Sequence, residues 1–98
     1  MKYEYNHRQY LQLEALAYNL FVLRFKAEDE YERKVLKETV QFTFNILDNL
    51  KVPYWVQNEM IFYVEQKLKY KYNIKEYLES RGITPKGKQE YYNWIVTR

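Results

Sequence analysis

The sequence predicts an all-α protein, a compact bundle of four to five helices in a single domain that spans residues 1–98. Glycine and proline, the residues that most often interrupt helices, occur only twice each in the chain. Apolar residues recur at spacings of three and four through much of the sequence, as they do on helices that bury one face. A chain of 98 residues can build one hydrophobic core but not two. We therefore expect long helices with short connections.

The first helix is expected from Asn6 to about Lys26. Asn6 is followed three residues later by Gln9, the pattern of a capping box at a helix start. Apolar side chains cover most of this helix and leave only a narrow polar stripe, so we expect it to be the most buried helix. Its expected core residues are Tyr10, Leu13, Ala17, Leu20, Phe21 and Phe25.

The second helix is expected to open at the acidic cluster of residues 28–32 and to end near Leu50. Negative charge at a helix start is stabilised by the helix dipole, and this explains the cluster better than a metal site does. Residues 40–46 also alternate with the period of a strand, but no turn residue separates them from the helical pattern. The expected core stripe is Val35, Leu36, Thr39, Phe42, Thr43, Ile46, Leu47 and Leu50.

The third helix is expected to start at Pro53, because proline is favoured at the first position of a helix. Val56, Met60, Val64 and Leu68 are spaced as its core stripe. Residues 68–74 allow a second interpretation, since their apolar and lysine residues alternate as in a short edge strand. That alternative is a winged-helix-like α+β fold with a strand at 68–74.

Two further helices are expected after the third. Asn73 with Glu76 repeats the capping pattern, and the short helix that it opens should stop at Gly82. Thr84 and Pro85 are typical of a cap followed by a first-turn proline, and they predict a final helix.

Positive charge is concentrated in the C-terminal half. The formal net charge is +3, yet residues 1–50 hold seven basic and eight acidic side chains, and residues 51–98 hold nine and five. Lysines alternate with tyrosines in residues 67–77; lysine neutralises phosphates and a flat ring stacks on bases. The same pattern fits a helix whose lysine stems and half-buried rings cover apolar surface. The candidate DNA-binding residues are Lys67, Lys69, Tyr70, Lys71, Tyr72, Lys75, Lys86 and Lys88.

Residues 83–88 read Ile-Thr-Pro-Lys-Gly-Lys and are followed by Tyr91 and Tyr92. This segment resembles the start of the last helix, after the wing, in many winged-helix DNA-binding proteins. The resemblance is local, and it implies DNA binding without identifying the residues that read bases. The composition, rich in Lys, Asn, Tyr, Ile and Glu, resembles that of small accessory proteins of phages and mobile elements of Gram-positive bacteria.

Three aromatic residues are expected on the polar faces of their helices. On a helical wheel Phe44 lies among polar residues of the second helix, and Trp55 and Phe62 lie among those of the third. Large exposed rings often mark protein interfaces. We therefore predict a protein-binding surface at Phe44, Trp55 and Phe62, for a larger protein or for a second copy of the chain. The alternative is that these rings form second core faces in a small bundle.

The residues needed for catalysis are sparse. The chain has one histidine, His7, one serine, Ser80, and no cysteine or glycine-rich phosphate loop. We expect no enzymatic activity, no metal, no cofactor and no small-molecule substrate. The longest apolar run, residues 15–23, is too short to cross a bilayer, and residues 1–8 lack the apolar stretch of a signal peptide. We expect a cytoplasmic protein without membrane contact.

Two functions remain open from the sequence. The first is a non-enzymatic, nucleic-acid-associated accessory protein of a phage or mobile element, which acts in DNA replication or regulation by binding DNA, a larger DNA-processing enzyme, or both. The second is a protein-interaction module or inhibitor, as a homodimer or a small subunit, with no nucleic-acid contact.

Overall fold

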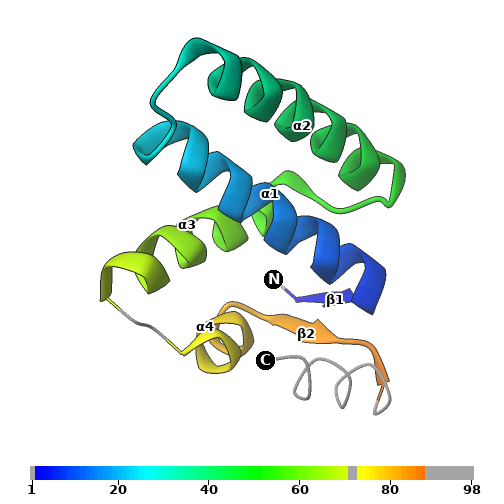
Figure 1. Cartoon of the computed structure of the whole chain (residues 1–98). Coiled ribbons are helices and arrows are strands. Elements are labelled where there is room, and N and C mark those ends of the chain that lie inside the picture. Colours follow the sequence, from blue (N-terminus) through cyan, green and yellow to red (C-terminus); the bar gives the residue numbers. More distant parts are fainter. Residues whose placement is uncertain (1, 71–72, 88–98) are drawn as a thin grey trace.

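The computed structural model describes residues 2–70 and 73–87. In this part of the chain it shows a helical bundle with four helices and one very small sheet, which confirms the predicted fold class (Figure 1). The elements are, in order, β1 (Tyr3–Tyr5), α1 (His7–Phe25), α2 (Glu30–Asn49), α3 (Tyr54–Tyr70), α4 (Ile74–Ser80) and β2 (Ile83–Pro85).

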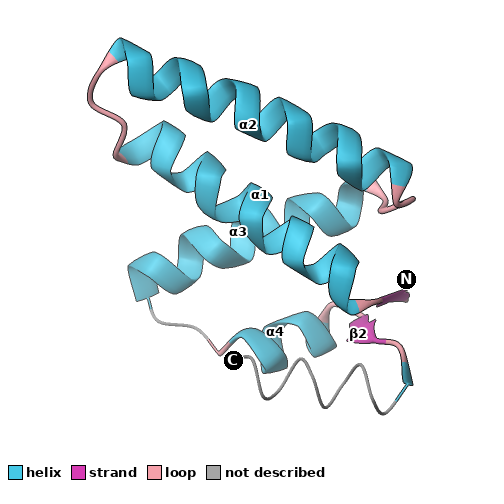
Figure 2. Cartoon of the chain, turned by 45° about the vertical axis from the view of Figure 1, so that its right-hand side comes forward, coloured by secondary structure: helices cyan, strands magenta, loops and turns pink. Residues whose placement is uncertain are grey.

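Helix α1 lies at the centre of the bundle, with α2 packed along one side and α3 along another (Figures 1 and 2). The predicted capping box is present at its start: the Asn6 side chain accepts from the Gln9 N–H, and the Gln9 side chain accepts from the Asn6 N–H, each at 2.8 Å. Six of its side chains are buried, the most in any described helix; they are Gln9, Tyr10, Leu13, Leu16, Ala17 and Leu20. The expectation that Phe25 belongs to the core is wrong, because its side chain is 55% exposed at the end of the helix.

Helix α2 is an outer helix whose main contacts are with α1. Asp29 caps it by accepting from the Glu32 N–H at 2.7 Å. Its buried residues are Val40, Thr43 and Leu47. A helix with one main neighbour buries only a narrow stripe, and this makes part of the predicted core stripe wrong. The residues of that prediction that are exposed are Val35 (43%), Thr39 and Phe42 (66%).

The connection between α2 and α3 is a tight turn at Lys51. This residue has a φ of 62°, which lies in the left-handed region that non-glycine residues seldom adopt. Its N–H donates to the Asp48 carbonyl at 3.1 Å, and the next N–H, that of Val52, donates to the Leu47 carbonyl at 3.0 Å. These bonds satisfy carbonyls that the end of α2 leaves free, and they hold Lys51 in its unfavourable conformation.

Helix α3 begins directly after Pro53, as the sequence predicts. Val56, Met60 and Val64 are buried as expected, whereas Leu68 is 46% exposed in the last turn, where less of the bundle covers it. The alternative strand at 68–74 is not present among the described residues of that segment. Residues 68–70 continue α3 and Ile74 opens α4, and residues 71–72 lie outside the described part.

A parallel pair of three-residue strands, β1 and β2, was not predicted. Tyr3 pairs with Ile83 and Tyr5 with Pro85, so the start of the chain lies beside the segment after α4 (Figure 1). Gly82, with a φ of 78°, turns the chain from α4 into β2 and accepts from the Tyr3 N–H at 2.6 Å. The prediction that residues 84–85 open a helix is therefore wrong for these residues, which belong to β2. Most of the expected last helix, residues 88–98, lies outside the described part.

Candidate binding surfaces

Two of the predicted nucleic-acid residues, Lys67 and Lys69, lie in the last turns of α3, beside the end of α1. The Lys69 ammonium is 5.1 Å from the centre of the Phe25 ring. The Lys67 ammonium is 5.9 Å from the ring centre of Tyr18 and 6.0 Å from that of Tyr63. These distances are within the range of cation–π contacts. The two lysines thus sit against aromatic rings that the sequence did not assign to a binding site.

Lys26 adds a third cation to this end of the bundle, and its ammonium is 5.9 Å from the centre of the Phe21 ring. We call Phe25, Lys26, Lys67 and Lys69 the basic end. Among the described residues, no carboxylate lies within ion-pairing distance of these lysines; Arg24 nearby is already paired with Glu65 at 2.8 Å. The carbonyls at the ends of α1 and α3 favour positive charge here, because each helix dipole is negative at its C-terminus.

The other predicted nucleic-acid residues do not join this group in the described structure. Lys86 is exposed, and its N–H donates to the Tyr5 carbonyl at 2.9 Å, which places it near the start of α1. The length of α1 is about 28 Å at 1.5 Å per residue, and it separates Lys86 from the basic end. Lys71, Tyr72 and Lys88 lie outside the described residues, and for Tyr70 and Lys75 only the helical backbone is described.

Of the three predicted interface residues, Phe62 is the one whose side chain is largely exposed, at 49%. Phe44 and Trp55 are partly buried and pack against the core. The Trp55 ring meets the Tyr3 ring edge to face, with centres 6.4 Å apart. Trp55 is therefore partly buried by Tyr3 of β1, a strand that was not expected from the sequence.

Phe62 lines a groove of about 420 Å³ between α3 and α4, together with Asn58, Glu59, Tyr77 and Arg81. The Glu59 carboxylate accepts from the Tyr77 hydroxyl at 2.5 Å and from two Arg81 nitrogens at 2.7 and 3.0 Å. The hydrogen bond from Arg81, with a smaller contribution from Tyr77, lowers the pKa of Glu59 below its ordinary value, although burial opposes the shift. The groove wall is thus an ion-paired clamp between α3 and α4, and its carboxylate is held in the charged state.

An apolar strip on the outer face of α1 is a feature that the sequence analysis missed. We call Leu11, Ala15, Tyr18, Val22 and Phe25 the α1 strip, and successive members are four, three, four and three residues apart. Leu11 is 46% exposed, Phe25 is 55% exposed and Ala15 is exposed, whereas Tyr18 and Val22 are half-buried. The spacing is visible in the sequence, but α1 has apolar residues around most of its circumference. Only the positions of α2 and α3 show which of its faces is left open.

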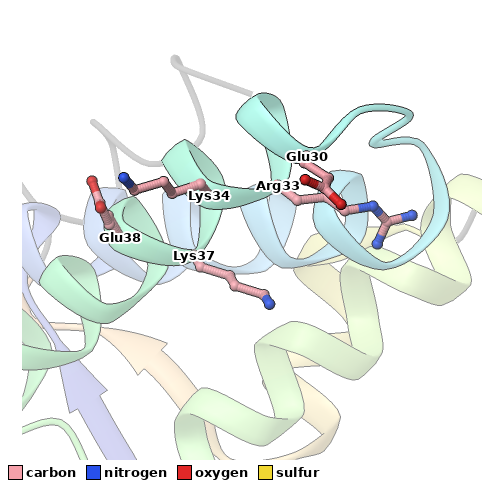
Figure 3. A pocket seen from close by; sticks show the side chains of 5 residues that line it. All are labelled: Glu30, Arg33, Lys34, Lys37 and Glu38. Atoms are coloured by element: carbon pink, nitrogen blue, oxygen red, sulfur yellow. The ribbon is translucent and has the colours of Figure 1, made fainter.

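A hollow of about 590 Å³ on α2 is lined by charged side chains, namely Glu30, Arg33, Lys34, Lys37 and Glu38 (Figure 3). Lys34 extends toward Glu38, and Lys37 points away from both (Figure 3). Arg33 donates to the Ala27 carbonyl at 2.9 Å. Three cations and two anions largely offset each other, so this hollow is a solvated charged face without a strong preference for one sign of ligand.

Within residues 2–70 and 73–87, no group of three or more His, Cys, Asp or Glu side chains is placed to hold a metal ion. None of the helices in this part is both long and apolar enough to cross a membrane. Comparison of the chain with protein families, with curated proteins and with solved structures gave no match in any of the three.

Proposed function

We propose that this chain is a non-enzymatic, nucleic-acid-associated accessory protein of a phage or mobile element that acts in DNA replication or regulation by binding. The observation that supports the proposal is the basic end. There Lys69 lies over Phe25, which is 55% exposed, and Lys26 lies over the adjacent Phe21 ring. Lys67 lies over Tyr18, further along α1. Lysines beside an accessible ring supply both elements of nucleic-acid binding, namely charge for phosphates and a surface for a base.

The charge of the basic end favours an anionic ligand. Lys26 and Lys69 are exposed, and Lys67 is half-buried. Each phosphate contact that these lysines make would contribute about 0.7 to 0.9 to the slope of log K against log salt concentration. If the basic end contacts phosphates, the affinity for nucleic acid should fall steeply as the salt concentration rises.

The test is fluorescence anisotropy with labelled single-stranded and duplex DNA between about 50 and 200 mM salt. The variant Lys26→Glu/Lys69→Glu removes two exposed cations of the basic end. The matched control, Lys34→Glu/Lys37→Glu, changes the net charge equally but alters the charged face of α2. We expect the first variant to bind at least about tenfold more weakly than the control, with a smaller salt slope. Equal losses in both variants, or no binding by the unmodified chain, would exclude the basic end as a nucleic-acid site.

A protein-interaction module without nucleic-acid contact is the second candidate function. It is favoured by the number of large apolar side chains that remain exposed in the described structure. These are Leu11, Phe25, Tyr31, Val35, Phe42, Tyr54, Phe62 and Leu68. In this case the lysines of the basic end serve to cover apolar surface with their stems and to contact rings. The same anisotropy measurement separates the two candidates, because the module requires no DNA binding at any salt concentration.

A further inference from the structure

We propose that the α1 strip is a docking surface for an amphipathic helix of a partner protein, one that carries acidic residues along the edges of its apolar face. The strip follows α1 over fifteen residues, from Leu11 to Phe25, which is about 21 Å for fourteen rises of 1.5 Å. The strip shares Phe25 with the basic end, but its exposed members Leu11 and Ala15 lie outside it, so a partner helix can bind the strip whether or not the basic end binds nucleic acid.

The spacing of the strip favours a helical partner. Residues that alternate at four and three positions form a straight row along a helix, and a second helix packs its own apolar row into such a row. Exposed Leu11 and Ala15 form one end, and half-buried Tyr18 and Val22 continue the row toward Phe25. A large residue beside a small one, as Leu11 is beside Ala15, leaves room for the side chain of a partner between them.

The charges at the edges of the strip favour an acidic partner. Arg8 is exposed one turn before Leu11 on the same face. On the α3 side, Lys67 lies over Tyr18 and Lys69 lies over Phe25. Among the described residues of α1, Glu14 is the only carboxylate; it borders the strip three residues after Leu11 and accepts from the Tyr10 hydroxyl at 3.4 Å. Acidic flanks on a partner helix would complement Arg8 at one end of the strip and Lys67 and Lys69 on its α3 side.

The same charges disfavour a second copy of this chain. Two antiparallel copies of α1 would align their strips about Tyr18, with Leu11 of each copy opposite Phe25 of the other. Because Lys67 lies over Tyr18, this arrangement would bring the two Lys67 ammonium groups together at the symmetry axis. Like charges in that position oppose association. Nucleic acid fits the first part of the strip poorly, since the exposed side chains of Leu11 and Ala15 offer no ring on which a base can stack.

The test uses two fluorescent synthetic helical peptides of about 18 residues, with leucines at alternating spacings of three and four. One peptide has glutamates at the flanking positions, and the other has lysines there. We expect the unmodified protein to bind the glutamate peptide at least about tenfold more tightly than the lysine peptide in anisotropy titrations. The variant Leu11→Gln/Ala15→Gln keeps charge and helix propensity but should lose this binding. Phe42→Gln, on the outer face of α2, is the matched control and should retain it.

A charge reversal makes the test sharper. In the variant Arg8→Glu/Lys67→Glu the edges of the strip become acidic, so the preference should switch to the lysine peptide. Equal affinity for both peptides, or unchanged binding by Leu11→Gln/Ala15→Gln, would refute the proposal. Light scattering provides a third outcome. If the unmodified protein is a dimer and Leu11→Gln/Ala15→Gln is a monomer, a second copy of the chain occupies the strip and the proposal is refuted. DNA binding of the Gln variant, which changes no charge, reports separately on the basic end.

Discussion

The side-chain amide of Gln9 donates a 2.8 Å hydrogen bond to the backbone carbonyl of Leu50, and it thereby joins the first turn of α1 to the end of α2. The same side chain accepts from the Asn6 N–H in the capping box. Gln9 thus satisfies a backbone group at the start of α1 and another at the end of α2, although Gln9 and Leu50 are 41 residues apart in the sequence. Such a connection fixes how α1 and α2 are aligned along their lengths.

We predict that Gln9→Met lowers the free energy of unfolding by about 1 to 3 kcal/mol, because partly buried backbone groups lose their partners. Gln9→Glu keeps the acceptor for the Asn6 N–H but sets a carboxylate oxygen against the Leu50 carbonyl oxygen at a buried position, so its loss at pH 7 should be at least as large. Both are measured by urea unfolding followed by circular dichroism. Gln41→Ala, at an exposed position in α2, is the control and should change stability by less than about 0.5 kcal/mol. A loss for Gln9→Met as small as that of the control would show that the connection contributes little.

Lys51→Gly should stabilise the protein. The residue holds a φ of 62°, which costs a non-glycine residue about 1 to 2 kcal/mol and costs glycine almost nothing. Part of this gain is offset by the greater freedom of glycine in the unfolded chain, so we expect a net increase of about 0.5 to 1 kcal/mol. Lys51→Ala removes the same side chain but keeps the Cβ, and it should show no gain. Thermal unfolding of the two variants side by side distinguishes the backbone effect from the loss of charge.

The clamp between Glu59 and Arg81 predicts a dependence of stability on pH. The pKa of Glu59 is lower in the folded protein than its ordinary value of 4.5, so its charged form favours folding. This contribution is fully present above pH 4.5 and is lost as the pH falls through the lowered pKa. Glu59→Gln should therefore be less stable than the unmodified protein at pH 7, and the difference should shrink in acid. Urea unfolding at pH 7 and at pH 3 measures it, with Glu38→Gln on α2 as the control. A constant difference at both pH values would contradict the clamp.

The buried hydroxyl of Tyr3 predicts that the protein loses stability in alkali, as Glu59 predicts a loss in acid. This hydroxyl is buried without a hydrogen-bond partner among the described residues, and burial raises the pKa of Tyr3 above its ordinary value of 10.0. The neutral form favours folding, so its contribution is present below pH 10 and is lost as the pH rises through the raised pKa. Tyr3→Phe should match or exceed the stability of the unmodified protein at pH 7, by up to about 1 kcal/mol, and should lose less stability above pH 10. Tyr31→Phe, at a side chain that is 79% exposed, should leave the alkaline profile unchanged.

The orientation of α2 is tested by two substitutions on opposite faces. Leu47 is fully buried, so Leu47→Ala should cost about 2 to 5 kcal/mol. Phe42 is 66% exposed, and Phe42→Gln should change stability by less than about 0.5 kcal/mol. Urea unfolding of both variants provides the comparison. A large loss for Phe42→Gln would mean that this ring lies against another surface.

Local signals located the helices well, because the groups that start and stop a helix lie within a few residues of one another. Asn6 caps α1 through Gln9, Asn73 caps α4 by accepting from the Glu76 N–H at 3.2 Å, and α3 begins directly after Pro53. In each case the hydrogen bond or fixed φ involves neighbours in the chain. The sequence by itself therefore determined the helical class, the number of described helices and most of their ends.

The tertiary structure decided which faces of those helices are covered. Phe42 and Phe25 are exposed and Phe44 is partly buried, the reverse of the wheel-based expectation, because burial depends on where α1, α2 and α3 touch. The pairing of β1 with β2 joins segments 80 residues apart, so no short-range pattern reveals it. Lys67 and Lys69 were chosen from sequence, but only the packing of α3 beside α1 brings them over Tyr18 and Phe25. Helix formation is a local equilibrium, whereas a binding surface is made by contacts between distant parts of the chain.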